Sequence, residues 1–133
     1  MSESPVPADT RVPALRVLMM PRDTNAHGTV FGGVILSYID QAAAVATRDY
    51  PPYRFVTAAM DRIAFKHPVF VGDLLSLYAR VLKIGRTSIL IQVEVDARRF
   101  ADPTQTVRVT QAELVYVAVD DQGRPTPIEH ATP

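Results

Sequence analysis

One stretch decides the fold: residues 30–49 read VFGGVILSYIDQAAAVATRD, with no proline between Val30 and Asp49. Alanine, valine, leucine and isoleucine predominate there, which predicts one long helix that ends before Pro51. Apolar side chains fall on nearly every side of this helix. Because a helix on a protein surface shows a single apolar stripe, we expect residues 30–49 to be buried all round.

The rest of the chain has the patterns of β-structure. Its clearest strand is Ser88–Arg98, where Ile89, Ile91, Val93 and Val95 alternate with polar residues. Gly85-Arg86, just before it, has the sequence of a two-residue type II′ hairpin loop. Further strands are expected at about residues 14–20, 56–65, 74–84 and 107–119. The order of one strand, a helix and four antiparallel strands predicts an α+β fold.

Length and composition predict one globular domain over residues 1–133, with an irregular leader at about 1–11 and an irregular tail at 121–133. The 14 basic residues equal the 14 acidic ones, so no basic surface for nucleic acid is expected. The absence of cysteine excludes disulfides, thiolate zinc sites and a cysteine nucleophile. The N-terminus lacks signal-peptide features, and Asp40 argues against a membrane span. A cytoplasmic protein is expected.

The predicted helix indicates a second subunit. A helix that is apolar all round needs more cover than one five-stranded sheet gives. A curved sheet would cover part of it and a second copy of the chain would cover more. We therefore expect a homodimer.

Asp40 is the first candidate for chemistry, since it lies about ten residues into the predicted helix. A buried carboxylate is costly unless it is paired or hydrogen-bonded. Asp40 is therefore either a structural group bonded to a neighbouring backbone or arginine, or a catalytic group. On a helical wheel one side collects small and polar residues: Gly33, Ser37, Asp40, Ala44 and Thr47.

The second candidate is the loop NAHGTVFGG at residues 25–33, which leads into the helix and holds three of the six glycines. Free N–H groups at a helix start suit an oxyanion or a polarised carbonyl; a tight loop would also need glycine. Asp40 follows Gly33 by seven residues, about 10 Å along a helix. Asp40 of a partner helix would reach that start more easily, which suggests a site shared between subunits.

Several motifs together resemble the hotdog-fold acyl-CoA thioesterases, in particular a bacterial acyl-CoA thioester hydrolase subgroup. They are MPRDTN at residues 20–25, Gly28, Phe31-Gly32-Gly33, Asp40 and the alanines at 42–44. Segments 65–68, 71–73 and 83–88 are similar too, and the resemblance covers about residues 12–120. It implies a long central helix wrapped by a curved five-stranded antiparallel sheet, homodimers with shared active sites, and trimers of such dimers.

The resemblance also implies a reaction, the hydrolysis of acyl-CoA to free acid and coenzyme A without metal or other cofactor. Asp40 would act as general base or as nucleophile, and Asn25 would place the water or the carbonyl. Backbone N–H groups of Gly32 and Gly33 would polarise the thioester, with Phe31 also counted as substrate-binding. The segment near the coenzyme A phosphates would be Arg86, Thr87 and Ser88, with Lys83, Lys66 and Arg62 as further phosphate partners.

Two other functions stay open. Hotdog folds include hydroxyacyl dehydratases, which pair a loop histidine with a helix carboxylate, and His27 precedes Asp40 by 13 residues. The asparagine and the Phe-Gly-Gly motif favour the thioesterase. A non-catalytic acyl-CoA-binding protein is the other alternative, since it would need the helix start and the cations but not Asp40. No Gly-x-Ser-x-Gly motif of an α/β-hydrolase is present.

Overall fold

The computed structural model describes residues 11–129. One helix and five strands appear in the expected order, together with a short 3₁₀ turn. In chain order they are β1 (Leu15–Leu18), η1 (Pro21–Asp23), α1 (Gly32–Thr47), β2 (Phe55–Asp61), β3 (Leu74–Ile84), β4 (Ser88–Arg98) and β5 (Thr106–Ala118). The predicted α+β fold is confirmed, and the residues expected to form a leader lie almost wholly outside the described range.

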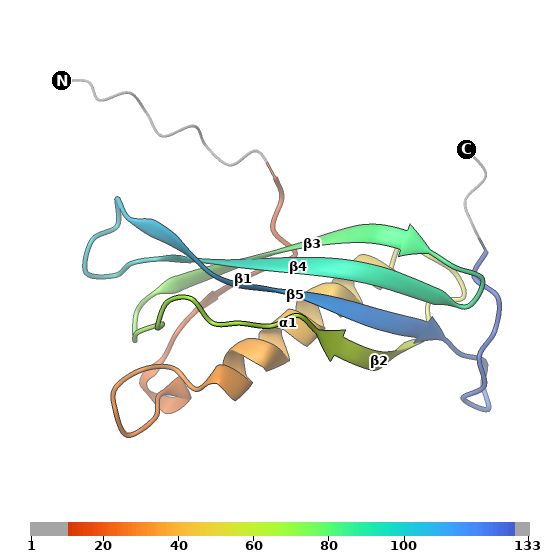
Figure 1. The fold of residues 1–133 in the computed structure, drawn as a ribbon, viewed down its shortest axis with the longest axis horizontal. Helices are drawn as coiled ribbons and strands as arrows, with labels where there is room; N and C mark the ends of the chain where they lie inside the picture. The colour runs from red at the N-terminus through yellow and green to blue at the C-terminus, as the bar shows by residue number, and fades with distance from the viewer. Residues whose placement is uncertain (1–10, 130–133) are drawn as a thin grey trace.

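The five strands form one antiparallel sheet in the order β1-β3-β4-β5-β2. The sheet curls and α1 packs against one of its faces, which is the hotdog architecture (Figure 1). The strand that follows the helix, β2, forms one edge of the sheet, and the short strand β1 forms the other. The three long strands β3, β4 and β5 therefore form the centre of the sheet. The side of β2 that faces away from β5 has no strand partner within the described residues.

The core lies between the helix and the concave face of the sheet. The alternation expected in β4 is confirmed, because Ile89, Ile91, Val93 and Val95 are all fully buried. Each such side chain stabilises the fold by roughly 1.5–3 kcal/mol relative to an exposed position. The helix contributes four buried apolar residues to the same cluster: Ile35, Ile39, Ala42 and Ala43.

The sheet of one chain does not bury the helix all round, as expected for a single five-stranded sheet. Its buried residues lie on one side, where the sheet covers them, and Val45 on another side is 45% exposed. The predicted small and polar stripe is not uniform either, since Ser37 is exposed and Thr47 is buried. One stripe of the helix, which holds Gly33, Ser37, Gln41 and Val45, is exposed.

Two chain reversals differ from the sequence expectation. Gly85 does not have the positive φ that a type II′ turn needs, and its N–H donates to the Ser88 carbonyl at 2.7 Å across a longer connection. The strand expected over 56–65 stops at Asp61, because Arg62 adopts a left-handed φ of 59°. The tail to residue 129 is irregular but not frayed, since Ile128 is only 5% exposed.

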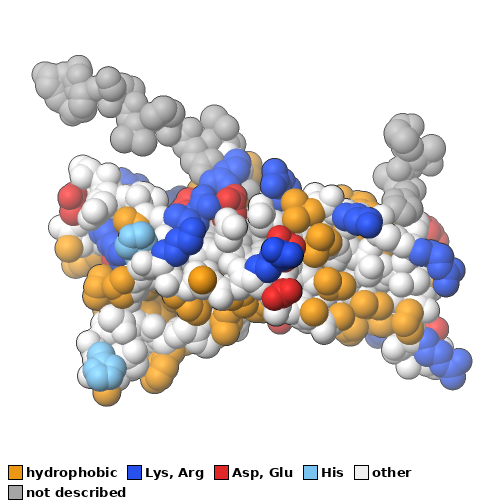
Figure 2. Space-filling model, in the orientation of Figure 1, with side chains coloured by type: hydrophobic (Ala, Val, Ile, Leu, Met, Phe, Trp, Pro, Cys, Tyr) orange, Lys and Arg blue, Asp and Glu red, His pale blue; other side chains and the backbone are white. Residues whose placement is uncertain are grey.

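The outer face of the sheet carries its charges as neighbouring pairs. Arg108 of β5 lies 2.5 Å from its cross-strand partner Asp96 and 2.7 Å from Glu94. Glu94 also pairs with Arg11, whose N–O distance is 2.6 Å. Figure 2 shows basic and acidic side chains lying next to one another over the middle of the molecule. The described basic side chains on this face are interspersed with acidic ones and form no purely basic patch.

Gly72→Ala is expected to destabilise the fold by about 1–3 kcal/mol. Gly72 has a φ of +87°, and a Cβ there would lie 2.7 Å from Cγ of Phe100. Urea unfolding measures the change. The matched control is Gly123→Ala, where φ is +78° but no atom lies within 4 Å of the added Cβ. Equal losses in the two variants would show that the contact with Phe100 costs nothing.

Candidate active site

The Asp40 carboxylate is held by two hydroxyl groups from the sheet. Thr57 donates from Oγ1 to Oδ1 of Asp40 at 2.7 Å. The Tyr116 hydroxyl contacts the same Oδ1 and also the main-chain carbonyl of Asp40, at 2.6 Å. Asp40 is half-buried rather than fully buried, and neither partner is the backbone group or arginine that a purely structural carboxylate was expected to have. Sequence reasoning missed both Thr57 and Tyr116.

The register of the sheet brings these two hydroxyls together. Thr57 of β2 and Tyr116 of β5 are cross-strand partners, and a β-bulge between Thr57 and Ala59 follows directly. Bulges re-aim side chains and are frequent beside functional sites. Tyr116 lies on the same buried face of β5 as Leu114, and it is 3% exposed. One signal for it was present in the sequence, because a tyrosine on the buried face of a strand needs a hydrogen-bond partner.

The electrostatics of the site keep Tyr116 protonated. Burial of its side chain, and next its hydrogen bond to the Asp40 carboxylate, raise the pKa of Tyr116 well above the usual value for tyrosine. Its hydroxyl therefore stays a hydrogen-bond donor at neutral pH. The Tyr116 hydroxyl therefore remains a hydrogen-bond donor beside Asp40 and does not compete with the carboxylate for a proton.

The helix start lies two turns away along α1. Its first intrahelical hydrogen bonds run from the N–H groups of Val34 and Ile35 to the Phe31 carbonyl, at 3.1 and 3.4 Å. Gly32 and Gly33 precede these donors, and such N–H groups have no acceptor within a helix. A Cβ on Gly32 would lie 3.4 Å from the Phe65 ring, whereas one on Gly33 would meet nothing within 4 Å. The backbone at Gly33 is therefore open to a ligand.

Asn25 organises the loop before the helix. Its Oδ1 accepts from the N–H groups of His27 and Thr29, at 2.8 and 3.2 Å, and its Nδ2 donates to Oγ1 of Thr29 at 2.9 Å. The loop is joined to the helix start by the Phe31 N–H, which donates to the Asp23 carbonyl at 2.9 Å. Asn25 and Gly33 therefore belong to one compact unit. His27 is exposed on this loop and does not contact Asp40.

The expected phosphate-binding residues fall into two groups. Arg86 and Thr87 lie in the β3–β4 connection, and Ser88, the first residue of β4, pairs with Val117 near the end of β5. Lys66 lies near the start of β5, since its N–H donates to the Val109 carbonyl at 2.8 Å. Val109 and Val117 are eight residues apart, roughly 26 Å along a strand.

One group of expected phosphate-binding residues lies near Asp40, and the other lies near the helix start. Asp40 contacts Tyr116, next to the Ser88 end of the sheet, and Lys83 of β3 lies at that end too. The helix start contacts Phe65, next to Lys66. Arg62 is exposed and lies 3.8 Å from Glu113, between the two groups. One protomer therefore does not bring all the predicted site residues together.

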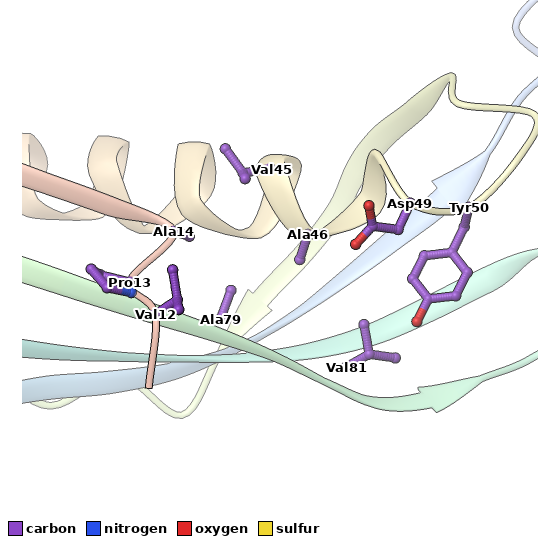
Figure 3. Close-up of a pocket in the computed structure, with 9 residues that line it drawn as sticks. All are labelled: Val12, Pro13, Ala14, Val45, Ala46, Asp49, Tyr50, Ala79 and Val81. Carbon is purple, nitrogen blue, oxygen red and sulfur yellow. The ribbon is translucent and has the colours of Figure 1, made fainter. Parts of the chain in front are cut away.

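A cavity of about 330 Å³ lies elsewhere, between the C-terminal half of α1, β3 and the segment before β1 (Figure 3). Val45 and Ala46 of the helix and Ala79 and Val81 of β3 line it, with Ala46 facing β3 and with Asp49 and Tyr50 at one end. Its lining includes none of the predicted site residues. Asp40 therefore lies outside this cavity, on the side of the helix that faces β2.

Residues 11–129 contain no group of three or more histidine or carboxylate side chains placed to hold a metal ion. Within the same range no helix combines the length and the apolar character needed to cross a membrane.

Comparison with known proteins agrees with the fold and the motifs. Residues 27–99 match the model of the thioesterase superfamily. The acyl-CoA thioester hydrolase YciA of Salmonella typhimurium is 41% identical over 116 residues, which cover 86% of this chain and 87% of that protein.

Solved structures extend the comparison. A hexameric hotdog-fold thioesterase of Campylobacter jejuni is 46% identical, with a TM-score of 0.82 over 88% of this chain and 90% of that one. A hexameric broad-specificity acyl-coenzyme A thioesterase is 40% identical, with a TM-score of 0.84 over 92% of this chain and 84% of that one. The chain therefore belongs to the thioesterase superfamily, among the hotdog-fold acyl-CoA thioester hydrolases.

Proposed function

We propose that the protein hydrolyses acyl-CoA to a free carboxylic acid and coenzyme A. The observation that carries this proposal is the Asp40 carboxylate, oriented by Thr57 and Tyr116 on the side of the helix that faces an edge strand. Thioester hydrolysis needs a group that activates water or attacks the carbonyl, together with donors for the developing oxyanion. No step of this reaction requires a metal or another cofactor.

Each predicted residue has a role in this reaction. Asp40 takes a proton from the attacking water, or attacks the thioester carbonyl itself. The N–H groups of Gly32 and Gly33 polarise the carbonyl oxygen, and Asn25 keeps their loop in place and orients the water or the carbonyl. Phe31, which is 52% exposed beside these glycines, contacts the substrate.

The site is shared between two protomers. Gly33 and Asp40 lie about 10 Å apart along one helix, too far for one carbonyl to contact both. The edge strand β2 is mostly exposed within one chain, and two copies of it could pair antiparallel across a two-fold axis. The two helices would then run antiparallel, so that Asp40 of one protomer faces the helix start of the other. Relatives that are hexamers support the further assembly of three such dimers.

The same pairing accounts for the two groups of cations. In one protomer Arg86 and Lys66 lie at opposite ends of β5. Antiparallel pairing of two copies puts the β3–β4 connection of one at the same end of the dimer as Lys66 of the other. Arg86, Thr87 and Ser88 then bind the coenzyme A phosphates together with three further cations: Lys83, Lys66 and Arg62.

Arg86→Ala is expected to raise KM for acyl-CoA about 10- to 100-fold with little change in kcat, because one charge-assisted phosphate contact contributes about 1.5–3 kcal/mol to binding. The Arg86 side chain is exposed, and only its main-chain carbonyl has a structural role, accepting from Ile128. Thiol release over a range of substrate concentrations measures the effect. Arg16→Ala, an exposed arginine on β1 at the other edge of the sheet, is the control. A lower kcat at unchanged KM would contradict the assignment.

The proposed activity is tested by free-thiol release from acyl-CoAs of short, medium and long chain. Turnover by the wild type is the expected result, and it gives the chain-length preference directly. Hydration of an enoyl-CoA, abolished by His27→Ala, would instead indicate the dehydratase. Binding of acyl-CoA without either reaction would indicate a non-catalytic binding protein. We expect His27→Ala to hydrolyse acyl-CoA as the wild type does, since the exposed His27 holds Asn25 through its main-chain N–H, which alanine keeps.

A further inference from the structure

The Tyr116 hydroxyl contacts one residue at two points. It lies 2.6 Å from the main-chain carbonyl of Asp40 and also contacts the carboxylate oxygen Oδ1. The carbonyl belongs to the helix backbone, whereas the carboxylate can rotate about the side-chain bonds. A single phenolic group that contacts both therefore ties the orientation of the carboxylate to the helix. Because Tyr116 is 3% exposed and its strand position pairs with both β2 and β4, it has little freedom to move itself.

The two oxygens of the Asp40 carboxylate are not equivalent. Oδ1 accepts from Thr57 at 2.7 Å and also contacts Tyr116, whereas Oδ2 has no hydrogen-bond partner among residues 11–129. No buried side-chain nitrogen or oxygen in that range lacks a partner. Asp40 is only half-buried, so Oδ2 is in contact with solvent rather than enclosed. Water can reach Oδ2 but must displace a hydroxyl to reach Oδ1.

We propose that Tyr116 is a positioning residue for acyl-CoA hydrolysis, which holds Asp40 through Oδ1 and so makes Oδ2 the oxygen that reacts. This inference rests on the proposed function. With Asp40 as general base, Oδ2 takes a proton from water, the water oxygen bonds to the carbonyl carbon, the carbon–sulfur bond breaks, and the proton passes to the coenzyme A thiolate. With Asp40 as nucleophile, Oδ2 forms an anhydride as the thiolate leaves, and water then hydrolyses that anhydride.

Tyr116→Phe is the direct test, since it removes one oxygen atom and keeps the ring in the core. We expect kcat for thiol release to fall about 10²-fold with KM unchanged, because misplacement of a reacting group by about 1 Å has an effect of that size. The matched control is Thr110→Val on the same strand. Thr110 is fully buried and its hydroxyl donates to the Ala64 carbonyl at 2.7 Å, so Thr110→Val also removes a buried hydroxyl-to-carbonyl hydrogen bond, away from Asp40.

A double variant separates positioning from a general loss of structure. If Tyr116 acts only through Asp40, then Tyr116→Phe added to Asp40→Asn lowers the rate no further than Asp40→Asn alone. Additive losses would overturn the proposal. So would a wild-type kcat in Tyr116→Phe, a raised KM at unchanged kcat, or an equal loss of kcat in Thr110→Val.

The same experiments distinguish this inference from the proposed function. If the wild type releases no thiol from any ester, the proposed function is wrong. If the wild type is active and Tyr116→Phe is equally active, only the inference about Tyr116 is wrong. A crystal structure of Tyr116→Phe provides a readout that is independent of activity. The proposal predicts a changed or divided Asp40 side-chain rotamer, and an Asp40 carboxylate in the wild-type position would overturn it.

Discussion

Asp40→Asn is expected to lower kcat for thiol release by about 10²–10⁴-fold, the range that general acid–base catalysis contributes. The amide has the shape of the carboxylate and keeps an oxygen that can accept from Thr57 and Tyr116, so the fold should persist. An amide, however, neither takes a proton from water nor attacks a thioester. Wild type and variant are compared by thiol release, and their binding of coenzyme A by calorimetry.

The control for this prediction is Asp49→Asn. It makes the same chemical change just after the same helix, where the carboxylate is exposed and has no contact with Thr57 or Tyr116. We expect wild-type kcat in this variant. Retention of full activity by a folded Asp40→Asn protein would contradict the role of the carboxylate, whatever happens at Asp49.

The largest expected effect on stability is at Asp73. Its carboxylate is 2% exposed and accepts from Arg99 at 2.8 Å and from the N–H groups of Phe70 and Phe100, each at 3.0 Å. Arg99 also donates to the Pro68 carbonyl at 2.8 Å. One buried ion pair thus joins the segment before β3 to the loop after β4.

Asp73→Ala is therefore expected to reduce the free energy of unfolding by about 3–5 kcal/mol, because removing one partner leaves a buried charge unpaired. That loss is a large share of the roughly 5–15 kcal/mol that stabilises a typical domain. Urea unfolding measures it. Asp121→Ala, which removes an exposed pair with Arg54, should leave the unfolding midpoint unchanged. An unchanged midpoint in Asp73→Ala would show that Arg99 finds another partner or becomes solvated.

The fold was predictable wherever a periodic pattern was long. Eleven alternating residues of β4 and an uninterrupted apolar helix identify their elements without knowledge of the partners. Turns were less predictable, because they depend on single backbone angles. Gly85 permits a positive φ but does not adopt one, and Arg62 adopts one although its sequence gives no signal for it.

The site was predictable only in part. Asp40 was identifiable because a carboxylate in an apolar helix needs a partner. Its partners were not, because Thr57 and Tyr116 are 17 and 76 residues away and meet Asp40 only through the register of β2 and β5. The helix was expected to be buried all round because its sequence is apolar on nearly every side. The sheet of one chain covers only one side of α1, and the sequence alone does not say what covers the other.

The most direct test of the shared site is thiol release by mixed oligomers of Asp40→Asn and Asn25→Ala chains. Each variant alone should be nearly inactive, since every site contains one defect. In a mixed dimer one of the two sites has both wild-type residues and the other has both defects, so activity should reappear on mixing. Absence of recovery, with mixed oligomers verified by native mass spectrometry, would contradict a site built from Asp40 of one protomer and the helix start of the other.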